Sequence, residues 1–271
     1  MFARVALAVT AVMAFASINV QAQEIVLAVN EGVSYHEGGS VSERYKPLTE
    51  LLSKELKRPV KVQNVDKYEE FDKGLTEGKY DLAFIHPAHI GLRAVKSGVY
   101  SGVATAKGFT DYRARVMVKK DSPLRSMQDL KDKKIGVPSV DSITTVLFSA
   151  SLREVKIQQP ERQFLPTRYQ DAVPFMIENG FVDAGVTGSS AVEKAWLAKG
   201  GRVLVETKPV PIKQFLISKK LSEAERAKLQ TLILNLSDND AGKAALTKIG
   251  LSGFVPWNNE VMNQASTRLG I

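Results

Sequence analysis

The sequence of 271 residues contains no cysteine. Disulfide bonds and thiolate metal ligands are therefore excluded, and packing alone must stabilise the fold. The sequence also lacks a G-x-S-x-G elbow, an H-E-x-x-H pair and a Walker loop, which are signatures of common hydrolases, metalloproteases and nucleotide-hydrolysing enzymes. We therefore predict a binding protein that is not an enzyme and needs no cofactor.

Long apolar runs are scarce, and the one at the N-terminus has the layout of a leader. Arg4 is followed by about a dozen mostly apolar residues over 5–16, and the small-residue pattern Val20-Gln21-Ala22 comes next. The run is shorter than the ~20 residues of a membrane-spanning helix, and polar residues follow directly. We predict a cleaved signal peptide over 1–22, and a bacterial periplasmic location fits an exported chain without disulfides.

Basic residues exceed acidic ones. The 37 Lys and Arg against 29 Asp and Glu give a formal charge of +8, which becomes +7 when Arg4 leaves with the leader. This balance favours anionic partners in general. Nucleic acid is not an expected partner, because Lys and Arg are spread along the chain without a basic stripe and the protein is exported.

Short apolar runs alternate with helical segments over 24–106 and again over 113–206. The segment 42–57, for example, places Leu48, Leu52 and Leu56 on one helical face after the strand-like run 24–30. Such alternation predicts an α/β fold of two lobes, each a mostly parallel sheet flanked by helices. Strand-like segments near 108–115 and 202–213 are expected to join the lobes.

Four strings, in order, resemble one known family. They are RYKPL at 44–48, G-KYDLAF at 78–84, LKDKKIGVP at 130–138, and YQDAV at 169–173 followed by GFVDAG at 180–185. The ordered set resembles the phosphonate- and phosphate-type solute-binding proteins of ABC transporters, which have the type II periplasmic binding fold. One feature differs: phosphonate-binding members usually place a histidine near the helix start that corresponds to 168–170, and this chain has none there.

The resemblance implies a lobe built from 23–108 and from 206–271, which hold the return crossover and the C-terminal helices. The second lobe is then 109–205. It also implies capture of a small anionic solute (phosphate, phosphonate or a related oxyanion) between the lobes and its delivery to a membrane permease. A sensor subunit for a histidine kinase is the alternative on the same fold, and we expect a monomer.

A hydroxyl-rich segment follows the predicted strand 135–137 and opens a helix. The backbone N–H groups of a helix start and nearby hydroxyls are suited to an anion, and the resemblance places the family's anion-binding turn here. The candidates are Ser139, Ser142, Thr144 and Thr145. Ordinary capping of the helix by Asp141 or Ser142 is the competing interpretation.

Further candidates follow other predicted strands. Tyr35 and Tyr45 could each donate a phenolic hydrogen bond, and Arg168 could clamp an oxyanion with Tyr169 beside it, unless this arginine is simply solvated. Thr187 opens another helix after the strand 182–186.

The three histidines of the chain, His36, His86 and His89, all follow predicted strands of the first lobe. They could act together as charged donors to an anion, or as neutral ligands of zinc, copper or nickel. Charged donors lose their effect as the pH rises through ~6.5, whereas metal affinity grows over that range. We favour the anion because the second lobe offers hydroxyls but no histidine; a purely structural role is the remaining alternative.

Overall fold

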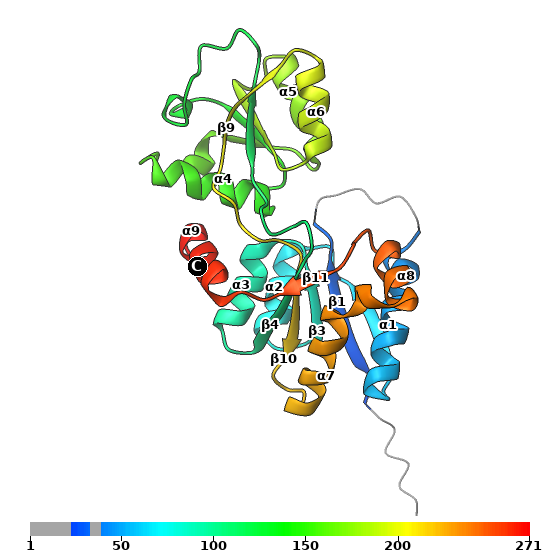
Figure 1. Cartoon of the computed structure of the whole chain (residues 1–271). Helices are drawn as coiled ribbons and strands as arrows, with labels where there is room; N and C mark the ends of the chain where they lie inside the picture. Colours follow the sequence, from blue (N-terminus) through cyan, green and yellow to red (C-terminus); the bar gives the residue numbers. More distant parts are fainter. Residues whose placement is uncertain (1–22, 33–38) are drawn as a thin grey trace, which may run out of the picture.

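The computed structural model describes residues 23–32 and 39–271, so the predicted signal peptide, Tyr35 and His36 lie outside the described residues. The chain forms two α/β lobes (Figure 1), each built on its own sheet. This confirms the predicted two-lobed α/β architecture. Among the described residues, no helix is both long and apolar enough to cross a membrane.

The first lobe holds a six-stranded sheet in the order β11-β4-β10-β3-β1-β2. Its strands are β1 (Ile25–Asn30), β2 (Val60–Asn64), β3 (Leu82–Ile85), β4 (Tyr100–Ala106), β10 (Gln214–Ser218) and β11 (Phe254–Pro256). The helices that follow these strands are α1 (Val41–Leu56), α2 (Tyr68–Thr76), α3 (Ala88–Lys96), α7 (Glu223–Leu234), α8 (Asp240–Lys248) and α9 (Asn259–Leu269).

The second lobe holds a five-stranded sheet in the order β7-β6-β8-β5-β9. Its strands are β5 (Arg115–Val118), β6 (Ile135–Val137), β7 (Phe164–Pro166), β8 (Ala184–Thr187) and β9 (Arg202–Glu206). Its helices are α4 (Ile143–Glu154), α5 (Val173–Glu178) and α6 (Ser190–Ala198).

Local sequence explains where the helices begin. Helix α1 starts at a capping box in which the Ser40 hydroxyl accepts from the Glu43 N–H while the Glu43 carboxylate accepts from the Ser40 N–H. Leu48, Leu52 and Leu56 then recur at helical spacing and pack into the core of the first lobe.

Both sheets are mixed, but most strands of each sheet run in the same direction, as predicted. In the first lobe β1 pairs in parallel with β2 and β3, whereas β10 runs antiparallel between β3 and β4. In the second lobe β5 runs antiparallel to β8 and β9. Strands β10 and β5 are the ones that enter their sheets directly from a crossover, so no helical return within the same lobe sets them parallel to their neighbours.

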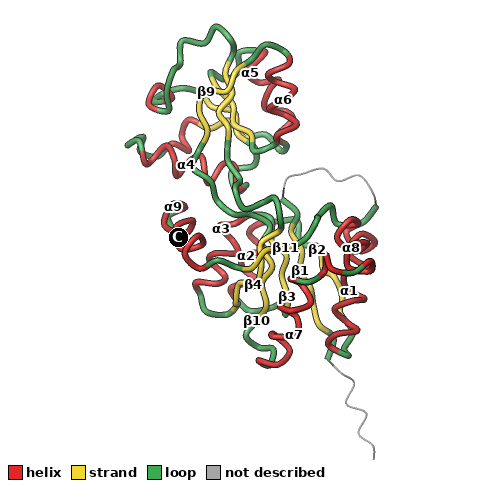
Figure 2. The backbone as a smooth tube through the Cα atoms, in the orientation of Figure 1, coloured by secondary structure: helices red, strands yellow, loops and turns green. Residues whose placement is uncertain are grey.

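The two crossovers, 107–114 and 207–213, are paired with each other. Tyr112 and Val210 exchange backbone hydrogen bonds of 3.1 and 3.0 Å, and the Ile212 N–H donates to the Phe109 carbonyl at 2.9 Å. Figure 2 shows both segments running as loops side by side between the lobes. A short antiparallel ladder therefore connects the lobes.

Helix α9 forms a third link between the lobes. It follows β11 of the first lobe, yet Met262, Ala265 and Leu269 pack in one apolar cluster with residues of the second lobe such as Leu147. The Arg268 guanidinium also donates to the carbonyl of Pro209 in the second crossover. The C-terminal helix thus contacts the second lobe and the second crossover as well as its own lobe.

Candidate ligand-binding site

The carboxyl ends of strands from both lobes face one another across the crossovers. His86 follows β3, Ser139 follows β6 after one proline, and Gly188 follows β8. A hollow of about 290 Å³ has walls from both lobes, with Tyr68 and His89 on one side and Asp141 on the other. Ligands of open α/β sheets bind at such strand ends, so this edge is the candidate site.

A polar cluster joins the first crossover to the second lobe. The Tyr112 hydroxyl and the Thr144 hydroxyl are 2.6 Å apart, and Thr144 is fully buried. Gln170 Oε1 accepts hydrogen bonds from the Thr187 hydroxyl at 2.8 Å and from the Gly188 N–H at 2.6 Å. Burial of the Tyr112 hydroxyl raises its pKa to about 12. The cluster therefore offers neutral hydrogen-bonding groups at neutral pH.

Glycine at position 188 allows this close approach. A Cβ atom there would lie 1.7 Å from the Tyr112 hydroxyl oxygen, well inside contact distance. The backbone of the second lobe and the first crossover therefore touch at a point where no other residue type fits without displacement.

The start of α4 uses much of its hydroxyl chemistry internally. The Ser142 side chain caps the helix by accepting from the Thr145 N–H, and the Thr145 hydroxyl donates to the Ser139 carbonyl at 2.9 Å. Ser142, Thr144 and Thr145 are each at most 2% exposed. Ser142 thus acts as the N-cap of α4, in agreement with the capping interpretation. The first N–H groups of the helix, those of Ile143 and Thr144, have no intrahelical acceptor. Ser139 is half-buried beside them.

The two described histidines lie where the sequence placed them, on the first-lobe side. The ring of His86 packs edge-on against Tyr112, with centroids 6.4 Å apart. It lies so close to Gly32, which has a φ of +79°, that a Cβ there would come within 2.8 Å of the ring. His89 is 4% exposed, and its Nδ1 has no hydrogen-bond partner among the described residues.

His89 is held neutral. Burial, reinforced by the Arg93 charge, lowers the pKa of His89 to about 3. A positively charged donor near neutral pH, as the anion hypothesis required, is therefore not favoured at this residue, although a neutral imidazole still has one N–H to donate. The metal alternative gains no support from the described residues, among which no three His, Asp or Glu side chains could hold an ion together.

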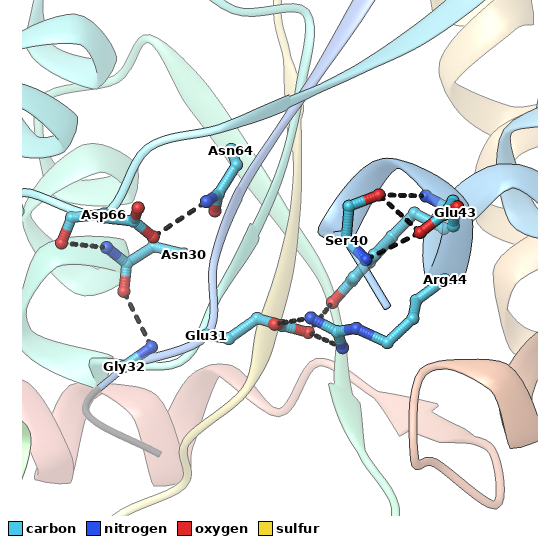
Figure 3. A network of polar contacts seen from close by, with 9 residues as sticks. Asn30, Glu31, Gly32, Ser40, Glu43, Arg44, Asn64 and Asp66 are labelled. Carbon is cyan, nitrogen blue, oxygen red and sulfur yellow. Dashed lines mark hydrogen bonds and ion pairs between the residues drawn. The ribbon is translucent and has the colours of Figure 1, made fainter. Parts of the chain in front are cut away.

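Tyr45 is placed differently from the prediction. It is completely buried, and its hydroxyl donates to the Glu31 carboxylate at 3.1 Å. Figure 3 shows the Arg44 guanidinium binding both oxygens of the same carboxylate, with one contact of 2.8 Å. Donating these hydrogen bonds to Glu31 raises the pKa of Arg44. Tyr45 and Arg44 thus fix the end of β1, and the Tyr45 phenol is engaged with Glu31 in this conformation.

Arg168 and Tyr169 lie at the rim of the second lobe. Arg168 is exposed and stacks 5.1 Å from the centroid of the Tyr169 ring, which is itself 42% exposed. The side chain of this segment that points inward is Gln170, which accepts a hydrogen bond from the Thr187 hydroxyl. Thr187 is fully buried and bonded in this way, so the structure brings Thr144 and Thr187 into one cluster and leaves Arg168 outside it.

Sequence reasoning missed Tyr68, Tyr112 and Lys213, whose ammonium lies 3.8 Å from the centroid of the Phe109 ring where the two crossovers pair. Burial raises the pKa of Tyr68, and the nearby Tyr112 and Asp141 raise it further. This first-lobe tyrosine therefore lies near both the first crossover and the second lobe. An aromatic residue inside a predicted crossover was the one available signal for Tyr112. Nothing in the local pattern distinguished Lys213 from the other lysines.

Two lobes on separate sheets, two paired crossovers and polar groups at facing strand ends define a two-lobed solute-binding protein. The family model for phosphonate periplasmic substrate-binding proteins of ABC transporters matches residues 33–262, and the chain belongs to this family. It is a substrate-binding family, so the chain is a binding protein and not an enzyme. A small solute and a membrane permease are the partners of this class, which is typically periplasmic.

Solved structures share the fold. XAC2383 from Xanthomonas citri bound to ATP has 15% identity and a TM-score of 0.75, covering 91% of this chain and 97% of that chain. PhnD1 from Prochlorococcus marinus in complex with methylphosphonate has 16% identity and a TM-score of 0.69, covering 90% and 96%. The aliphatic sulphonate binding protein SsuA from Escherichia coli has 17% identity and a TM-score of 0.61, covering 92% and 91%. No curated protein sequence matches the chain significantly.

Proposed function

We propose that this protein captures a small oxyanion, such as a phosphate or phosphonate, between its lobes and delivers it to an ABC permease. The observation that carries the proposal is the polar cluster at the start of α4. There, the N–H groups of Ile143 and Thr144, which have no intrahelical acceptor, lie beside Ser139 and the Tyr112–Thr144 pair. They follow Asp141, which lines the hollow together with Tyr68 and His89. Such groups bind tetrahedral anions without supplying a full charge.

The chemistry of the similar proteins agrees with this class of ligand. Methylphosphonate, an aliphatic sulphonate and ATP each carry a tetrahedral oxyanion group, and each appears in the name of a protein with this fold. Export to the periplasm through the predicted leader and a monomeric state complete the proposal.

A thermal-shift screen tests the ligand class. Mature protein is screened against phosphate, methylphosphonate, sulfate, methanesulfonate and ATP, followed by calorimetry, because a ligand that binds only the folded state raises the melting temperature. Tyr112→Phe should weaken binding by about 1–2 kcal/mol through loss of one buried hydroxyl. Tyr100→Phe is the matched control, since the Tyr100 hydroxyl bonds the Tyr80 carbonyl in the first-lobe core, at 2.7 Å.

Small-angle scattering tests the capture step. Closure about the paired crossovers should reduce the radius of gyration when the anion found in the screen is added to saturation. If none of the five anions changes the melting temperature, or if the radius is unchanged at saturation, capture of an oxyanion between the lobes is refuted.

A further inference from the structure

Lys213 occupies an unusual position at the point where the second crossover enters the first lobe. Its N–H donates to the His86 carbonyl at 3.3 Å, and its own carbonyl accepts from the Ala106 N–H at 2.9 Å. These contacts hold the residue between the ends of β3 and β4, at the edge that faces the second lobe. Its φ is +56°, a left-handed conformation that is uncommon for a lysine.

The ammonium group of Lys213 lies over an aromatic ring of the other crossover. Its Nζ is 3.8 Å from the centroid of the Phe109 ring. Burial lowers the pKa of Lys213, while the more distant charge of Glu31 opposes this shift. Among the described residues Lys213 forms no ion pair with a carboxylate. A partly buried cation without a directly bonded carboxylate is unfavourable, and an anion beside it relieves this cost.

The other basic side chains near the facing edges are already occupied or exposed. The Glu31 carboxylate binds Arg44, Asp72 binds Arg93, and two glutamates bind Arg115, while Arg168 is exposed at the rim. Among the described residues at these edges, Lys213 is therefore the partly buried lysine or arginine without an ion pair, and it can meet a ligand charge.

We propose that Lys213 receives the anionic group of the ligand and thereby selects solutes with a full negative charge over neutral ones. This inference rests on the proposed function. Because Lys213 belongs to one crossover and contacts Phe109 of the other, the ligand charge acts directly on the connection that bends. The ligand class is a small tetrahedral oxyanion that bridges Lys213 and the start of α4 in the closed protein.

Calorimetry with phosphate and methylphosphonate tests this role on wild type, Lys213→Met and Lys213→Arg. Lys213→Met should lose affinity by roughly 10- to 100-fold, the range for one hydrogen bond to a charged group, and Lys213→Arg should stay within a few-fold of wild type. Lys219→Met is the matched control, because Lys219 is exposed just beyond the opposite end of β10. Its affinity should equal that of wild type.

The possible results distinguish failure of the proposed function from failure of the role of Lys213. Wild type that binds none of the screened anions refutes the proposed function and this inference together. Wild type and Lys213→Met with equal affinity refute the role of Lys213 alone. Should Lys213→Met fail to fold, NMR of ¹³C-methylated lysines in wild type decides, with the Lys213 signal assigned from its absence in Lys213→Arg. The pKa of that signal should rise on adding methylphosphonate, and an unchanged pKa overturns the inference.

Discussion

His89 should make the protein lose stability in mild acid. In the unfolded chain this imidazole takes up a proton near pH ~6.5. In the folded protein, burial and the Arg93 charge hold its pKa at about 3. Protonation between these values stabilises only the unfolded chain, so the contribution of His89 is fully present above pH ~6.5 and is lost progressively as the pH falls towards 3.

The magnitude follows from the two pKa values. Between pH 8 and pH 5 the linkage relation gives a loss of about 2 kcal/mol in the free energy of unfolding from this one residue. The pKa values of some carboxylates, such as Glu43 and Asp129, are lowered in the folded protein. Their protonation also reduces the free energy of unfolding as the pH falls, but in more acidic solution. The effect of His89 is therefore measured as the difference in unfolding free energy between wild type and a variant without this histidine.

The assay compares denaturant unfolding of wild type and His89→Gln at pH 8, 6.5 and 5. The stability gap between the two proteins should shift by about 2 kcal/mol in favour of the variant from pH 8 to pH 5, because glutamine does not titrate. A gap that stays constant with pH, or an NMR titration of His89 with a midpoint near 6.5, would show that the reasoning about its burial is wrong.

Two further changes test the contacts that frame the site. Gly188→Ala should push the Tyr112 hydroxyl away from Thr144 and lower the free energy of unfolding by about 1–3 kcal/mol, the usual effect of overpacking, in chemical denaturation; unchanged stability would mean that Tyr112 moves without strain. Arg44→Met should destabilise by about 3 kcal/mol because it removes the guanidinium that binds both oxygens of the Glu31 carboxylate, and Glu31→Gln combined with Arg44→Met should be less destabilised; equal losses would contradict this coupling.

The sequence predicted the parts of the molecule that depend on local pattern. Alternating apolar runs and helical segments indicated two α/β lobes, and the hydroxyl-rich segment after 135–137 does open a helix, α4, capped by Ser142. Side-chain direction could not be predicted in the same way. Tyr45 lies near a helix start that resembles a ligand-binding motif. In the folded chain, however, its phenol donates a hydrogen bond to Glu31, fourteen residues earlier.

The missed residues share a physical cause. Tyr112 meets Thr144 across 32 positions of sequence, and the Lys213 ammonium lies over Phe109 across the two crossovers. The first contact joins a crossover to α4 and the second joins the two crossovers, and contacts between segments distant in sequence leave no periodic signal in either of them. The mixed sheets follow from the same pairing, since β10 enters the first lobe directly from the second crossover.

Helix α9 limits the kind of motion that can accompany binding. Because Met262 and Leu269 pack in the cluster that includes Leu147 of α4, a simple hinge that separates the lobes would have to expose apolar surface. Packed helices move more readily by sliding along one another, and Arg268, bonded to the Pro209 carbonyl, would travel with the second crossover. If the lobes close by bending at the paired crossovers, sliding of α9 on α4 would keep that apolar surface covered. The C-terminal helix would then guide the closure that we propose a ligand at Lys213 and α4 to drive.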